Sequence, residues 1–298
     1  MHSSVSLKPA IDAVSAALDQ RFERLFAAPD DSRARLYEAL RYAMIGGGKR
    51  MRPLLVMAAC EIFHVDKERA LRVAMAIEAV HGYSLIHDDL PCMDDDDMRR
   101  GKPTLHKAFD EATAVLAGDA LLSFAFEILS DPATHADAHV RIELVRELAL
   151  ASGASGMVGG QMMDMAAADH DYDLGEITRL QQLKTGALIG FAVEAGGIMG
   201  KAGPEARTKL KGFARDLGLA FQIADDLLDA DGDSARTGKA VRKDVEAGKA
   251  TFVSLLGLER ARKQAHMLID QAIDHLHGYG AEADLLRAIA RFAIERDR

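Results

Sequence analysis

Residues 217–229 read LGLAFQIADDLLD, an apolar helical run that closes on Asp225, Asp226 and Asp229. Asp225 and Asp229 are four residues apart, so on a helix they share one face and lie about 6 Å apart along the axis. Carboxylates gathered at the end of an apolar helix repel one another and resist the loss of hydration. The stretch therefore predicts a helix that carries a cation site. Paired hard oxygen ligands suit Mg²⁺, which fills its other positions with water and phosphate oxygens.

A second cluster, DDLPCMD at residues 88–94, follows another largely apolar run, AVHGYSLIH at 79–87. Asp88 and Asp94 are six residues apart, which on an ideal helix places them about 120° apart around the axis. Pro91 cannot continue the helical hydrogen-bond ladder, so we expect a break there that brings Asp94 back toward the metal. An acidic run by itself is as often a solvated surface. Two such clusters, each followed by a basic loop, favour a metal site.

The composition predicts a helical bundle. Hydrophobic residues make up 49% of the 298 residues, aromatic residues only 5%, and tryptophan is absent. Runs of β-branched residues are scarce and no segment alternates with the period of a strand, so a sheet is not expected. No internal repeat or low-complexity linker divides the chain. We therefore predict a single all-α domain over residues 1–298.

Charge and targeting signals limit the partners and the location. The net charge of −9 argues against nucleic acid, because backbone phosphates need a basic face, but it leaves anionic small molecules open. The two cysteines, Cys60 and Cys92, fit a reducing compartment. No secretory signal is recognised at the N-terminus, and Asp119 and Glu194 break the most apolar stretches, so no membrane span is expected. We predict a soluble cytoplasmic protein.

Helical periodicity recurs along nearly the whole chain. The predicted helices are 10–27, 32–45, 53–63, 68–90, 111–130, 137–152, 155–167, 174–199, 204–230, 250–277 and 282–295. Two long polar loops, 91–103 and 230–248, each follow one aspartate cluster. Long irregular loops in compact domains often cover or bind ligands, so we expect one site that is covered from two sides.

Basic residues accompany both clusters. The loop GGKRMRP at 47–53 leads into a helix start, where exposed N–H groups and basic side chains together form an anion site. Arg99 and Arg100 closely follow Asp94 and add two guanidinium groups for anions. The other basic positions are Lys184, which interrupts an apolar helix, and Lys239 and Lys249, which flank the second loop.

Five segments, in this order and at these separations, resemble the motifs of bacterial short-chain trans-isoprenyl diphosphate synthases. They are GGKRMRP at 47–53, HGYSLIHDDLPCMD at 81–94, RRGKPT at 99–104, KTG at 184–186 and FQIADDLLD at 221–229. The resemblance covers nearly the whole chain and is greatest to farnesyl diphosphate synthases. It implies the all-α isoprenoid synthase fold with a central active-site cavity, a homodimer, and several Mg²⁺ ions per site. The implied reaction joins dimethylallyl or geranyl diphosphate head to tail with isopentenyl diphosphate.

The resemblance also implies roles for individual residues. The direct Mg²⁺ ligands match Asp88, Asp94 and Asp225, with Asp89, Asp226 and Asp229 supporting them. The isopentenyl diphosphate site matches Lys49, Arg52, His81 and Arg100. The allylic diphosphate site matches Arg99, Lys184, Thr185, Gln222, Lys239 and Lys249, of which the first four are expected to act in catalysis.

Product length is expected to depend on Tyr83 and Ser84, which lie five and four residues before Asp88. Tyr83 lies about 7.5 Å down the helix axis, and an aromatic residue there resembles farnesyl-producing enzymes. Ordinary core or interface packing is the other interpretation of Tyr83. Two alternative functions are a geranylgeranyl diphosphate synthase and a non-catalytic subunit of a heteromeric prenyl synthase. The second is disfavoured because the chain keeps both its aspartates and its basic residues.

Overall fold

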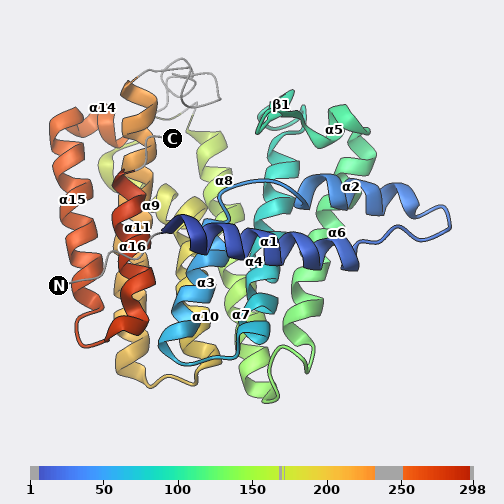
Figure 1. The fold of residues 1–298 in the computed structure, drawn as a ribbon. Coiled ribbons are helices and arrows are strands. Elements are labelled where there is room, and N and C mark those ends of the chain that lie inside the picture. The colour runs from blue at the N-terminus through green and yellow to red at the C-terminus, as the bar shows by residue number, and fades with distance from the viewer. Residues whose placement is uncertain (1–6, 168–169, 171, 232–250, 296–298) are drawn as a thin grey trace. The chain divides into compact units, whose positions relative to one another are not determined.

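The computed structural model describes residues 7–167, 170, 172–231 and 251–295, and this part of the chain is almost entirely helical (Figure 1). Its α-helices are α1 (Leu7–Leu25), α2 (Ala34–Met44), α3 (Met51–Ile62), α4 (Lys67–Asp88), α5 (Leu105–Ala108), α6 (Glu111–Ser130), α7 (Ala138–Ser152), α8 (Met157–Ala166), α9 (Leu174–Gln181), α10 (Ala187–Met199), α11 (Pro204–Asp231), α14 (Phe252–Leu256), α15 (Leu258–His275) and α16 (Asp284–Glu295). The all-α prediction is confirmed.

The described residues form two compact units. The first, the N-terminal unit, comprises 7–57 and 66–145, and the second, the C-terminal unit, comprises 58–65, 146–167, 170, 172–231 and 251–295. Each unit has its own buried core. One domain with a central cavity stays a prediction.

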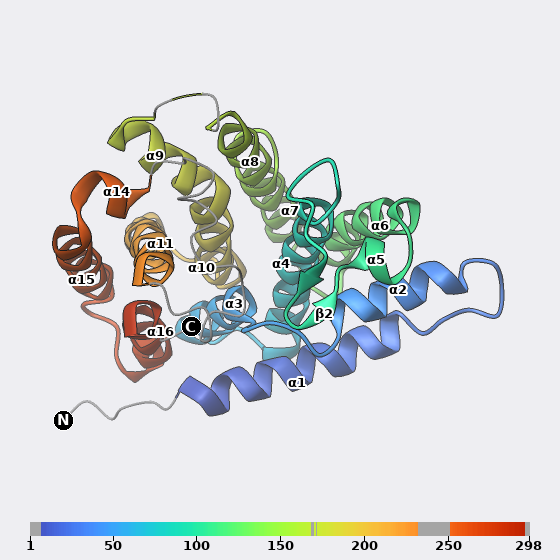
Figure 2. The same ribbon diagram turned by 90° about the horizontal axis from the view of Figure 1, so that it is seen from above.

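The core of the N-terminal unit is built on α4, which packs most extensively against α6. The helix starts at Asp66, whose carboxylate accepts a hydrogen bond from the Arg69 amide at 3.1 Å and caps the exposed N–H groups. Asp110 caps α6 in the same way through the Thr113 amide at 2.7 Å. Figure 2 views α4 and α6 nearly end-on, with α1 and α2 lying across the view. The capped helix α4, packed against α6, thus carries the first aspartate cluster at its C-terminal end.

The core of the C-terminal unit is built on α11, which packs most extensively against α15 and also against α10 and α16 (Figure 1). Phe213, Leu217, Ala220 and Ile223 of α11 are buried at helical spacing, so one face of the helix enters this core. The C-terminal part of the same helix carries the second aspartate cluster. Burial of the apolar face therefore fixes the orientation of the aspartates.

Helix α6 is long and apolar enough, by length and composition, to cross a membrane, with a mean hydropathy of 1.6 in its most apolar window. Core helices of soluble proteins pass the same test. Residues such as Ala117, Leu121 and Ala125 are fully buried in the N-terminal unit, which is typical of a core helix. Val115 and Leu116, at 41% and 57% exposure, leave part of α6 uncovered.

Three local features differ from the predicted elements. A two-stranded hairpin, β1 (Met98–Arg99) and β2 (Lys102–Pro103), stands in the first polar loop, and its two-residue strands are too short for a period-2 pattern. The helix predicted over 174–199 is interrupted by a π-helical turn at Gln182–Gly186. The helix predicted over 250–277 is divided at Gly257, whose φ of 80° ends α14 before α15 begins.

Candidate active site

The first aspartate cluster lies where α4 ends. The helix closes at Asp88, and after the turn through Pro91 the amide of Asp94 donates a hydrogen bond to the Asp88 carbonyl at 2.8 Å. The backbone therefore folds back at the proline, as its missing N–H predicted. Asp88 is half-buried and Asp94 is exposed, so both carboxylates can keep contact with water or a ligand.

The second residue of this cluster has a different environment. Asp89 is 3% exposed, and the Nε of Arg99 donates to its two carboxylate oxygens at 2.7 and 2.8 Å. The Nη2 of Arg99 adds a contact of 2.6 Å. A buried carboxylate needs such a partner, and this planar pairing suits guanidinium. Arg99 is thus committed to Asp89 through Nε and Nη2.

Arg100 forms the turn of the hairpin with Gly101. Both have positive φ, 53° and 75°, as a two-residue type I′ turn requires. A left-handed conformation is costly for a residue with a side chain, and such strain gathers at functional sites. The turn places the Arg100 guanidinium against the glycine loop, because a Cβ on Gly48 would lie 2.7 Å from its Cζ. The two arginines therefore point to different neighbours.

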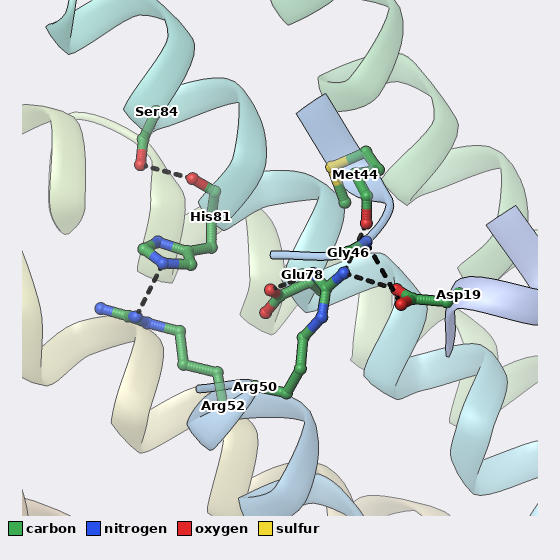
Figure 3. Close-up of polar contacts among 8 residues, drawn as sticks. All are labelled: Asp19, Met44, Gly46, Arg50, Arg52, Glu78, His81 and Ser84. Atoms are coloured by element: carbon green, nitrogen blue, oxygen red, sulfur yellow. Dashed lines mark hydrogen bonds and ion pairs between the residues drawn. The ribbon is translucent and has the colours of Figure 1, made fainter. Parts of the chain in front are cut away.

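Arg50 is a residue that the sequence analysis did not place in the site. It is 3% exposed with a φ of 49°, and it binds Glu78 of α4 at 2.6 Å and Asp19 of α1 at 2.9 Å. It also donates to the Met44 carbonyl at the end of α2 (Figure 3). These bonds fix the start of α3 and hence Lys49 and Arg52 on either side. The sequence did contain a signal for Arg50, because it is the third basic residue in a short loop whose other two, Lys49 and Arg52, were assigned to substrate.

His81, which belongs to α4, lies close to several arginines of the N-terminal unit. Its Nε2 faces the Nη1 of Arg52 at 3.3 Å. Among the residues drawn in Figure 3, the hydrogen bonds of His81 and those of Arg50 form two separate groups. Loss of hydration and then the positive charges of Arg52, Arg100, Arg99 and Arg50 hold the pKa of His81 well below its usual value. The imidazole is therefore neutral near pH 7 and accepts the hydrogen bond from Arg52. The predicted residues Arg52, His81 and Arg100 belong to one cationic cluster.

Tyr83 and Ser84 lie one turn or slightly more before Asp88 on α4. Tyr83 is 7% exposed, and its ring meets the His87 ring edge-on with 5.7 Å between centroids. Burial and then the charge of Asp88 raise the pKa of its phenol. The hydroxyl of Ser84 donates to the His81 carbonyl at 3.0 Å. Tyr83 is therefore a packed aromatic group below the first cluster.

The second aspartate cluster lies within α11, which runs unbroken to Asp231. Asp225 and Asp229 are half-buried, whereas Asp226 is 7% exposed. The Asp226 carboxylate accepts from the Gln222 amide at 3.1 Å and from the backbone amide of Phe252 at 2.8 Å. Asp226 therefore joins α11 to α14, while the two half-buried carboxylates share the face that the spacing predicted.

The π-helical turn at 182–186 presents two predicted catalytic residues. The Lys184 ammonium binds Asp164 of α8 at 2.9 Å. The Thr185 hydroxyl donates to the Gln222 side-chain oxygen at 3.4 Å, and Gln222 in turn donates to Asp226. Thr185, Gln222 and Asp226 therefore form a hydrogen-bonded chain. Lys239 and Lys249 lie outside the described residues.

The donor set fits Mg²⁺ by its chemistry. Within the part of the chain that the structure describes, no three His, Cys, Asp or Glu side chains are grouped so as to hold a metal ion alone. Mg²⁺ usually takes only one or two carboxylates and completes its octahedron with water and phosphate oxygens. Asp88 with Asp94, and Asp225 with Asp229, are pairs of that kind.

Known proteins resemble the chain over almost its full length. The farnesyl diphosphate synthase of Escherichia coli (strain K12) is 43% identical, covering 97% of this chain and 98% of its own. The apo crystal structure of a FPP/GFPP synthase from Zymomonas mobilis is 60% identical, with a TM-score of 0.90 and coverage of 96% and 98%. The geranyltransferase of Helicobacter pylori, solved with magnesium and isoprenyl diphosphate, is 32% identical, with a TM-score of 0.82 and coverage of 99% and 100%.

The fold of these solved structures confirms the expected all-α isoprenoid synthase architecture. A model of the polyprenyl synthetase family matches residues 33–290, which include all five segments that carried the resemblance. The chain belongs to the polyprenyl synthetase family.

Proposed function

We propose that the chain is a farnesyl diphosphate synthase, which joins an allylic diphosphate head to tail with isopentenyl diphosphate. One observation carries this proposal. The Arg100 guanidinium has no hydrogen bond or ion pair to any described residue, although it is held in a strained turn beside Arg50 and the glycine loop. A guanidinium held in this way suits a diphosphate.

The isopentenyl diphosphate is assigned to Lys49, Arg52, His81 and Arg100. His81 is neutral near pH 7 and accepts from Arg52, so it orients this guanidinium and acts as neither an acid nor a cation. The buried Arg50 holds the loop that carries Lys49 and Arg52. These residues bind the diphosphate and orient the substrate, so that its double bond can attack the allylic cation.

The allylic substrate reacts by heterolysis of its C–O bond, and the leaving pyrophosphate takes both electrons. Arg99, Lys184, Lys239 and Lys249 are assigned to the growing negative charge, which is electrostatic stabilisation by preorganised groups. Mg²⁺, when bound by Asp88, Asp94 and Asp225, supplies further positive charge to the same oxygens. The carboxylates position the metal ions, and the basic side chains add further positive charge around the leaving pyrophosphate.

The allylic cation needs stabilisation by groups that do not react with it. The Thr185 hydroxyl and the Gln222 amide are neutral dipoles, and their mutual hydrogen bond and the bond to Asp226 fix their orientation. The isopentenyl double bond then donates its electron pair to the allylic cation and forms the new C–C bond, and the resulting tertiary cation loses a proton to a pyrophosphate oxygen to give the product. No side-chain base is required, and exclusion of water protects the cation.

Product length is assigned to Tyr83, with Ser84 beside it on α4. A buried ring one turn below the first cluster is placed to stop a growing apolar chain. Geranylgeranyl pyrophosphate synthases of plants resemble the chain at a similar identity, so C20 product is the alternative outcome. Retention of both aspartate sets argues against a non-catalytic subunit.

We also propose that the protein is a homodimer of the cytoplasm. Val115 and Leu116 of α6 and Ile142 of α7 are exposed apolar residues in the N-terminal unit, and a second copy is the occupant that would cover them. Free cysteines at positions 60 and 92 fit a reducing compartment.

Product analysis tests this function. Purified protein is incubated with Mg²⁺, isopentenyl diphosphate and dimethylallyl or geranyl diphosphate, pyrophosphate release is measured, and the dephosphorylated products are separated by chromatography. The proposal expects pyrophosphate and a C15 alcohol. Absence of pyrophosphate would falsify synthase activity, whereas a C20 alcohol would keep the chemistry and replace the product.

A further inference from the structure

We infer that Gly160 and Asp164 of α8 are positioning residues for catalysis, because they hold the π-helical turn at Gln182–Gly186 and aim Lys184 from it. This inference rests on the proposed function. Neither residue has a role in the mechanism above. Both belong to the C-terminal unit, as does the turn that they contact.

Gly160 is the closest neighbour of the turn on α8. A Cβ at this position would lie 2.2 Å from the Lys184 nitrogen, 2.6 Å from the Lys184 Cα and 2.8 Å from the Leu183 carbonyl carbon. All three atoms are backbone, which cannot swing aside as a side chain can. The backbone of α8 and the backbone of the π turn therefore touch at the position where Lys184 leaves the helix.

Asp164 lies one helical turn after Gly160 and faces the same way. Its carboxylate binds the Lys184 ammonium at 2.9 Å, with side-chain exposures of 17% and 31%. A lysine side chain has four rotatable bonds, so a partly buried ion pair removes much of the freedom that binding a substrate would otherwise have to remove. The ammonium keeps further N–H donors for a phosphate.

The other side of the turn faces α11. A Cβ on Gly218 would lie 3.3 Å from the Cα of Gly186, and Gln222, one turn further along α11, accepts from Thr185. The π turn is therefore packed between two helices with a glycine at each contact. π-Helical insertions of one turn are frequent at functional sites, where they redirect side chains. Here the insertion sends Lys184 toward α8 and Thr185 toward α11.

Asp164→Asn is the first test, since it keeps the size of the side chain and removes its charge. We expect kcat to fall by about 10–100-fold with KM for isopentenyl diphosphate changed less than about twofold. Lys184→Ala and the double variant complete a thermodynamic cycle. If Asp164 acts through Lys184, the double variant is no slower than Lys184→Ala alone, because the effects of residues acting as a unit do not add.

Gly160→Ala tests the backbone contact, and Gly190→Ala in α10 is its matched control. A Cβ on Gly190 meets no atom within 4 Å, so this variant should keep full activity and stability. We expect Gly160→Ala to lose about 100-fold in kcat. This variant is also expected to unfold more easily. Its affinity for inorganic pyrophosphate in the presence of Mg²⁺ is therefore measured by calorimetry, at a temperature where the variant is folded.

Three results separate the possibilities. If the wild-type protein shows no prenyl-transfer activity, the proposed function itself is overturned. Active wild-type protein with additive losses in the Asp164 and Lys184 cycle overturns the positioning role of Asp164. Gly160→Ala with normal kcat and normal pyrophosphate affinity overturns the role of the close contact, whereas loss of both supports it.

Discussion

The two aspartate clusters share a sequence pattern but differ in how the chain holds them. Asp88 ends α4 and Asp94 returns to it through a proline turn, whereas Asp225 and Asp229 lie within the continuous helix α11. The helix macrodipole disfavours carboxylates at a helix C-terminus. In the first cluster, the Arg99 guanidinium that binds Asp89 supplies positive charge beside these carboxylates.

A common feature appears beneath this difference. In each pair of adjacent aspartates the second residue is buried and bonded, Asp89 to Arg99 and Asp226 to Gln222 and Phe252. The first residue of each pair, Asp88 or Asp225, is half-buried. Adjacent residues of a helix point in directions about 100° apart, so one carboxylate can serve the protein and the other a ligand. In both pairs, therefore, the second aspartate supports the fold, and we propose that the first binds the metal.

The largest effect is expected for the first residue of each pair. Asp88→Asn and Asp225→Asn should each lower turnover by about 10²–10³-fold, because charge on the leaving group loses its compensation. Steady-state kinetics with saturating Mg²⁺ measure this. Asp95→Asn is the matched control, since Asp95 is an exposed acid of the same loop with a φ of 50° that asparagine tolerates. Near-normal turnover of Asp88→Asn would remove it from the metal site.

The second residue of the first pair should affect stability most. Asp89→Asn removes the buried carboxylate charge that the partly buried Arg99 guanidinium contacts at 2.6 Å and leaves it Asp96 at 3.9 Å, so we expect a loss of about 3 kcal/mol in unfolding free energy. Urea unfolding measures it. Asp97→Asn breaks the exposed ion pair with Lys107 and should lower the stability far less, because water screens an exposed pair. Equal losses in the two variants would contradict the structural role of Asp89.

The second residue of the other pair should have a smaller effect on stability. Asp226→Ala removes the acceptor of the buried Phe252 amide, which costs about 1–3 kcal/mol. Turnover should fall as well, because Gln222 loses the bond that orients it. Gln222→Ala combined with Asp226→Ala should then add little to the kinetic loss. Full additivity would show that Asp226 does not act through Gln222.

The buried ring of Tyr83 lies five residues before Asp88 on the same helix, and this position predicts a change in product. Tyr83→Ala should shift a fraction of the output from C15 to longer chains, because the blocking ring is removed. Chromatography of the products measures the shift. Tyr83→Phe keeps the ring and should keep C15. Unchanged output from Tyr83→Ala would assign the residue to packing alone.

The smallest effect concerns pH. Because the folded-state pKa of His81 is lowered, the unfolded chain binds more protons than the folded chain below pH 6.5. This contribution to stability is present above that pH and is lost as the pH falls toward the folded-state pKa. We expect His81→Asn to lose less stability than wild-type protein between pH 7.5 and 5.5, as followed by urea unfolding. The α11 approach at 217–224 has no titratable residue and should add no such dependence.

Most of the fold could be predicted because its signals are local. Apolar residues at helical spacing predicted the long helices, including α4, α6 and α11, within a few residues of their observed ends. Pro91 predicted the fold-back of Asp94. The π turn at 182–186 could not be predicted from local signals, because the backbone that packs against it, at Gly160, is 24 residues away from Lys184 in sequence.

The sequence by itself determined the helical class, the two carboxylate clusters and the basic residues around them, because residue type and short spacing carry this information. Only the tertiary structure decided how these residues are used. Arg99 binds Asp89, the buried Arg50 holds the glycine loop, and Lys184 is aimed by α8. Such assignments depend on which charges are desolvated together, and desolvation is a property of packed neighbours that no local pattern records.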